Sequence, residues 1–118
     1  MAIELNCRTT WTVGLAAQAG VILVPKEAIA NIVDVLNDAG ITSFTVQKAK
    51  GFWQGEKENT LLVSVLHTVS DQPCIGNHGP YFAQDVAAKL AGTLNQACVL
   101  YEQVPVFARF INGEGEEI

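Results

Sequence analysis

The segment ITSFTVQKAKGFWQGEKENTLLVSVLHTV, residues 41–69, decides the fold because it holds two runs in which apolar and polar residues alternate. The runs are ITSFTVQKAK (41–50) and NTLLVSVLHTV (59–69), and a period of two is typical of β-strands. The second run is also rich in β-branched residues, which fit a pleated surface. We therefore predict two consecutive strands, joined by GFWQGEKEN at 51–59.

A helical pattern lies on each side of this pair of strands. In PKEAIANIVDVLNDAG (25–40), Pro25 suits the first helical turn, and Gly40 can adopt the left-handed conformation that ends a helix. After a loop rich in Gly, Pro, Asn and Asp, we predict a second helix from Tyr81 to about Leu94. Its apolar residues are four positions apart and form one stripe: Phe82, Val86, Leu90 and Leu94.

The two ends of the chain add further strands. TTWTVGLAA (9–17) alternates ahead of the first helix, QACVLYEQV (96–104) follows the second, and VFARFI (106–111) predicts a short fifth strand before the acidic tail NGEGEEI (112–118). The core order is βαββαβ, in which two crossover connections put both helices on the same face of an antiparallel sheet. We therefore expect an α+β fold, a ferredoxin-like βαββαβ sandwich that forms a single domain over residues 1–118.

The predicted strands are apolar on both faces, which favours assembly of several copies. Leu61, Val63 and Val65 alternate with Leu62 and Leu66, so only one of these sets can pack under the helices. The other set would leave an apolar patch larger than the few hundred Å² usual on a soluble monomer. Because only 16% of the residues are charged, we expect a homo-oligomer, either a closed ring or a two-fold dimer.

Charge and cysteine content exclude several classes of function. The net charge is −5 and the basic residues are scattered, so the chain cannot neutralise many phosphates and nucleic acid is not an expected partner. Cys7, Cys74 and Cys98 share no CxxC spacing, and we expect no metal site. Cys98, in the apolar run ACVLY, is predicted to be a small buried residue.

The N-terminus gives no sign of export or of a membrane anchor. MAIELNCRTT lacks a basic start followed by an apolar block. No apolar run approaches the roughly 18 residues that would cross a bilayer. We therefore expect a soluble, cytoplasmic protein that does not bind membranes.

The connection GFWQGEKEN has two interpretations. A glycine turn with charged residues is the ordinary way to keep a hairpin tip soluble. That interpretation explains Phe52 and Trp53 less well, because a large exposed aromatic side chain forgoes about 1.5–3 kcal/mol of burial free energy. An indole face beside the carboxylates of Glu56 and Glu58 would favour a cation instead. The two carboxylates share a face if the strand starts early, and otherwise only one of them faces the site.

The pattern GFWQGEKENTLLVSVL, followed by a helix and by NQACVLY, resembles the small phage-encoded S-adenosylmethionine lyases. The resemblance covers about Gly51 to Tyr101, and NQACVLY is its strongest part. It implies a PII-like trimer with active sites between subunits, acting in the cytoplasm of a phage's host. It also implies a reaction without a cofactor, in which S-adenosylmethionine is split into homoserine lactone and methylthioadenosine.

The resemblance assigns roles to residues of the connection. The acidic position falls on Glu58, the catalytic residue, which would hold the ammonium or sulfonium of the substrate. Glu56 would support the negative potential. The aromatic position falls on Trp53, where the family has a tyrosine and a longer stretch before the acid, and the indole would pack on the cation or on the adenine.

Further residues are candidates for binding the substrate. The edges of the adenine would be read by backbone groups, by Gln47 or by Gln54. Tyr101 and Glu102 are neighbours on a strand and point to opposite faces. We expect Tyr101 in an interface and Glu102 in the site.

Two other functions fit the same sequence. One is a non-catalytic PII-like protein that binds or sequesters a nucleotide or metabolite in the same cleft between subunits. The other is a purely structural or interaction subunit. His67, at the end of a strand, is predicted to be a hydrogen-bonded structural residue.

Overall fold

The computed structural model describes residues 4–68 and 82–118, and these residues form four strands and two α-helices. The elements are β1 Leu5–Gly14, η1 (a 3-10 turn) Gln18–Gly20, α1 Pro25–Asp38, β2 Thr45–Trp53, β3 Glu56–His67, α2 Phe82–Thr93 and β4 Leu100–Ala108. Helix α1 begins at Pro25, as predicted. It ends shortly before Gly40, whose φ of 82° is in the left-handed region that favours glycine.

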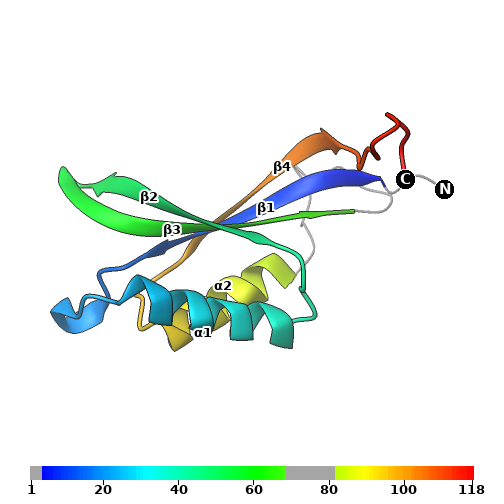
Figure 1. Ribbon diagram of the computed structural model, residues 1–118. Coiled ribbons are helices and arrows are strands. Elements are labelled where there is room, and N and C mark those ends of the chain that lie inside the picture. Colours follow the sequence, from blue (N-terminus) through cyan, green and yellow to red (C-terminus); the bar gives the residue numbers. More distant parts are fainter. Residues whose placement is uncertain (1–3, 69–81) are drawn as a thin grey trace.

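The strands form one antiparallel sheet in the order β2-β3-β1-β4. Figure 1 shows α1 and α2 together beneath one face of this sheet, and no helix of the described residues covers the other face. The ferredoxin-like α+β fold predicted from the sequence is confirmed. We call the uncovered side the open face.

The core lies between the helices and the sheet. Every second residue of β1 and β3 points toward the helices, and Trp11, Val13, Leu61 and Val63 are fully buried there. The helices supply the opposite side of one cluster with Ala28, Ile32, Val35, Leu36, Ala83, Val86, Ala87 and Leu90. This single cluster packs the layer of helices against the layer formed by the sheet.

Trp11 makes the largest contribution of a single side chain to this core. Its indole Nε1 donates a hydrogen bond to the Ala83 carbonyl at 2.9 Å, and its ring meets Phe82 edge-on. We expect Trp11→Phe to lower the free energy of unfolding by about 2 kcal/mol, because the smaller ring leaves a void and the buried indole hydrogen bond is lost. Urea unfolding measures this change. The matched control is Trp53→Phe, at a side chain that is 72% exposed, and an equal loss in both variants would contradict the prediction.

The connection between β2 and β3 is much shorter than predicted. The strands continue to Trp53 and resume at Glu56, so the turn is only Gln54 and Gly55. Both turn residues have positive φ, 50° and 82°, which is the geometry of a tight two-residue hairpin. The far part of this β2–β3 hairpin, residues 48–59, is called the arm, and Figure 1 shows it extending beyond the helices. The charged composition of residues 56–59 indicated a loop, but these residues remain paired with β2 in the sheet.

The C-terminal part also differs from the prediction. Strand β4 begins at Leu100 rather than at 96 and continues to Ala108, so the two predicted strands are one. Pro105 fits within it because β4 is an edge strand, and an edge tolerates a residue without an N–H. Cys98 precedes the strand and is exposed, so the prediction that it is buried is wrong.

The open face is more polar than the alternation in β3 predicted. Leu62 and Leu66 do lie on it, and Leu66 is 39% exposed. However, Thr10 stands directly opposite Ser64 and is hydrogen-bonded to it at 3.2 Å. The strands that flank β3 therefore add polar side chains that the pattern of β3 alone does not reveal. Larger exposed apolar side chains are found toward the end of the chain, among them Phe107, Phe110 and Ile111.

Candidate functional site

The arm places Trp53, Glu56 and Glu58 on one face. Trp53 is directly opposite Glu56, and Gly51 is directly opposite Glu58. Because β3 begins at Glu56, the two carboxylates are two residues apart on a regular strand and point to the same side. Gly51 adds no side chain opposite Glu58, and a Cβ added there would meet Thr60 Cγ2 at 3.3 Å.

The loop that follows β1, at the same end of the sheet as the arm, forms the second wall. After β1 ends, Leu15 donates its N–H to the Asn59 carbonyl at 2.9 Å, which ties the start of the loop to β3. The loop then reverses direction, with Ala16 bridged to Ile22. The Ala16 N–H lies 3.4 Å from Glu58 Oε1, within hydrogen-bond range.

Arm and loop enclose a hollow of about 420 Å³, the size of a small-molecule site. We call it the hairpin hollow; it is lined by Leu15, Ala16, Ile22, Trp53, Gln54, Glu56, Lys57, Glu58 and Asn59. It combines an indole, apolar side chains, two amides and three charges. Such a set can bind a ligand with a flat apolar part and a cationic part.

Glu58 is the more enclosed of the two carboxylates. It is half-buried whereas Glu56 is exposed. Its carboxylate also lies directly over Gly14, where an added Cβ would come within 2.8 Å of Glu58 Cδ. The glycine at the end of β1 therefore makes room for this acid.

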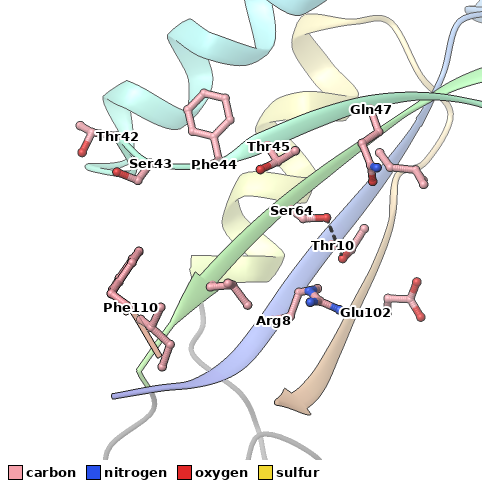
Figure 2. A pocket seen from close by; sticks show the side chains of 13 residues that line it. Arg8, Thr10, Thr42, Ser43, Phe44, Thr45, Gln47, Ser64, Glu102 and Phe110 are labelled. Carbon is pink, nitrogen blue, oxygen red and sulfur yellow. Dashed lines mark hydrogen bonds between the residues drawn. The ribbon is translucent and has the colours of Figure 1, made fainter. Parts of the chain in front are cut away.

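Gln47 and Glu102 line a different hollow, on the open face. This open-face hollow has a volume of about 1050 Å³ and is shown in Figure 2, with Arg8 on β1 and Glu102 on β4. Gln47 is opposite Leu62, four residues along β3 from Glu58, which is about 13 Å at the usual rise of a strand. Within one chain the structure therefore brings together Trp53, Gln54, Glu56 and Glu58 but not Gln47 and Glu102.

Sequence reasoning missed several residues of both hollows. Ala16 and Ile22 come from a loop that is about 40 positions away in the chain, and no local pattern links that loop to the arm. Arg8 is one of the scattered basic residues, and no pattern around it indicates a site. Lys57 could have been predicted as a site residue from the sequence, because it lies between Glu56 and Glu58 in GFWQGEKEN.

His67 lies on β3 outside both linings and is hydrogen-bonded, as the sequence predicted. Its Nε2 is 2.8 Å from Thr9 Oγ1, and its ring meets Phe82 edge-on. Burial lowers the pKa of His67 below its usual 6.5, although a backbone hydrogen bond at Thr68 opposes the shift. The folded protein thus holds this imidazole neutral more readily than the unfolded chain does.

This shift predicts a loss of stability in mild acid. The contribution of neutral His67 is complete above pH 6.5 and is lost as the pH falls toward the lower folded-state pKa, because the unfolded chain then binds the proton more tightly. We expect the melting temperature to fall between pH 7.5 and 5.5. The fall should be smaller in His67→Asn. An unaltered fall in His67→Asn would contradict the assignment.

Two absences apply to residues 4–68 and 82–118. Within these ranges no group of three or more His, Cys, Asp or Glu side chains is arranged to hold a metal ion. Nor is any helix there both long and apolar enough to cross a bilayer.

Solved structures with a similar fold include two of a phage SAM lyase. The structure in complex with S-methyl-5′-thioadenosine matches with a TM-score of 0.61 and 17% sequence identity, over 89% of this chain and 84% of that chain. The apo structure matches with a TM-score of 0.56 and 14% identity, over 88% of this chain and 85% of that chain. No protein-family model and no curated protein matches the sequence. At these identities the similarity establishes a shared fold.

Proposed function

We propose that the protein is an S-adenosylmethionine lyase that forms homoserine lactone and methylthioadenosine. The observation that carries the proposal is the hairpin hollow, in which Trp53 lies on the same face as the carboxylates of Glu56 and Glu58. The substrate is an adenosyl sulfonium, so it offers the flat ring and the positive charge that this lining can bind. The shared fold with a phage SAM lyase solved with S-methyl-5′-thioadenosine supports the same choice.

The proposed reaction needs little chemistry from the protein. A carboxylate oxygen of the substrate attacks its own γ-carbon, the bond from that carbon to sulfur breaks, and the electron pair stays on sulfur. The products are a five-membered lactone and a neutral thioether, and no proton is transferred. The main task of the site is to hold the substrate folded, with the two reacting atoms in contact.

Four residues of the hollow have roles in this proposal. Glu58, half-buried and held near the Ala16 N–H, binds the sulfonium or the ammonium. Trp53 packs on the adenine or on the cation, Glu56 adds negative potential at the mouth, and Gln54 reads an edge of the adenine. Glu58 touches the substrate and is the catalytic residue of the proposal.

Assembly is part of the proposal. Trp53 is 72% exposed in the single chain, and contact with a second copy would enclose it against a ligand. Gln47 and Glu102 line a separate hollow, so they join the substrate site only if the open face of one copy meets the arm of another. We propose a homotrimer with sites between subunits, and sedimentation equilibrium tests it by giving the mass in solution.

Incubation with S-adenosylmethionine tests the function directly. Purified protein should release methylthioadenosine and homoserine lactone in equal amounts, at a rate well above the spontaneous breakdown measured without protein. Separation of the nucleosides by chromatography and detection of the lactone by mass spectrometry give both yields. No methylthioadenosine above the spontaneous rate at high protein concentration excludes the lyase. Tight binding of an adenosyl ligand that is recovered unchanged would instead support the non-catalytic binding protein.

A further inference from the structure

Among the described residues that line the hairpin hollow, one side chain is cationic, and it carries none of the roles proposed for Trp53, Gln54, Glu56 and Glu58. Lys57 lies between Glu56 and Glu58 in β3 and lines the same hollow. Because side chains alternate along a strand, the side chain of Lys57 projects from the face opposite to the two acids. It still reaches the hollow because the pairing of β1 with β3 ends at Gly14 and Thr60, so that both faces of β3 border the space beyond.

The other two lysines of the arm have a different environment. Lys48 and Lys50 do not line the hairpin hollow but a second small hollow beside Pro25, at the start of α1, which shares only Leu15 and Asn59 with it. Lys57 is therefore distinguished from them by position and not by residue type. This gives a matched lysine on the same arm for comparison.

The charges of the hairpin hollow mirror those of the proposed substrate. Glu56 and Glu58 carry two negative charges and Lys57 carries one positive charge. S-adenosylmethionine carries two positive charges, on its ammonium and sulfonium, and one negative charge, on its carboxylate. A hollow with acids alone would leave the substrate carboxylate facing like charges, which is unfavourable.

We propose that Lys57 binds the carboxylate of the substrate. The proposal rests on the proposed function and names the group that positions the attacking atom. The ammonium of lysine has three donors and no acceptor, and pairs with a carboxylate as a point charge. Held by Lys57 at one end and by Glu58 at the sulfonium, the substrate is bent so that the carboxylate oxygen approaches the γ-carbon.

The same arrangement favours release of products. Ring closure converts the carboxylate into an uncharged ester, and loss of the leaving group converts the sulfonium into an uncharged thioether. Lys57 and one of the acids then lose their charged partners at once. The products are therefore held less tightly than the substrate.

Binding of unreactive ligands tests the role of Lys57 without depending on turnover. S-adenosylhomocysteine carries the carboxylate but has a neutral thioether in place of the sulfonium, and its decarboxylated analogue lacks only the carboxylate. We expect Lys57→Met to weaken binding of S-adenosylhomocysteine about fivefold in calorimetry, as for a partly exposed ion pair. Binding of the decarboxylated analogue should not change. Lys57→Arg should restore most of the loss, and Lys50→Met should affect neither ligand.

The outcomes separate this inference from the proposed function. Equal weakening of both ligands, or of neither, in Lys57→Met overturns the role of Lys57 even if the wild-type protein is an active lyase. Selective weakening together with no release of methylthioadenosine supports Lys57 and excludes the lyase. If the wild-type protein binds neither ligand at millimolar concentration, the role of Lys57 fails, and the release of methylthioadenosine alone decides whether the protein is a lyase.

Discussion

Glu58→Gln is expected to lower kcat/KM for S-adenosylmethionine about 100-fold while the protein stays folded. The amide keeps the volume of the side chain but removes the negative charge that faces the substrate cation. A loss of two orders of magnitude corresponds to about 2.7 kcal/mol of transition-state stabilisation, within the range for a charged hydrogen-bonded group. The initial rate of methylthioadenosine formation measures the effect, and the melting temperature shows whether the fold is retained.

Two further variants make this result specific. Glu56→Gln should have a smaller effect, because Glu56 is exposed whereas Glu58 is half-buried. Glu114→Gln changes an exposed acid near the C-terminus and leaves the hairpin hollow intact, so it should have no effect. A Glu58→Gln variant as active as Glu114→Gln would remove Glu58 from the proposed site. A larger effect at Glu56 would move the catalytic role to that residue.

The fold was predictable because local signals agreed with the order of elements. Period-two alternation marked the strands, and Pro25 and Gly40 marked the limits of α1. The boundaries that failed have a common cause. Residues 56–59 are charged because the arm extends into solvent. Pro105 lacks a backbone N–H, which an edge strand tolerates. In both places the composition indicated a loop where the backbone is extended.

The candidate site was predictable only within the arm. Glu56 and Glu58 are two apart in one strand, so their shared face follows from the pleat once the turn is known to be short. The wall formed by the loop at 15–22 depends on contacts across the sheet, which no single-chain pattern encodes. Gln47 and Glu58 were predicted to bind the same ligand because of their residue types. Within one chain, however, the separation of four residues along β3 between their positions keeps them in different hollows.

Gly14→Ala should impair the site while leaving the fold intact, because Gly14 is where the sheet makes room for Glu58. An alanine Cβ there would lie 2.8 Å from Glu58 Cδ and 3.2 Å from Oε2, too close for the present position of the carboxylate. The obstructing atoms are the flexible end of a side chain, and the φ of Gly14 is outside the left-handed region. The side chain can therefore rotate away at little cost in stability, and alanine also restricts the unfolded chain. We expect an unchanged or slightly higher melting temperature and a kcat/KM at least tenfold lower.

A double-mutant cycle shows whether the effect of Gly14→Ala passes through Glu58. In the Glu58→Gln background the charge is already absent, so displacing the side chain should cost less than twofold, and the two effects should be strongly non-additive. Gly92→Ala in α2 is the glycine control, because its added Cβ meets nothing within 4 Å. If Gly14→Ala lowers kcat/KM equally in both backgrounds, it acts by another route. If it leaves the wild-type rate unchanged, catalysis does not require the Glu58 carboxylate above the end of β1, and the hairpin hollow is not the reaction site.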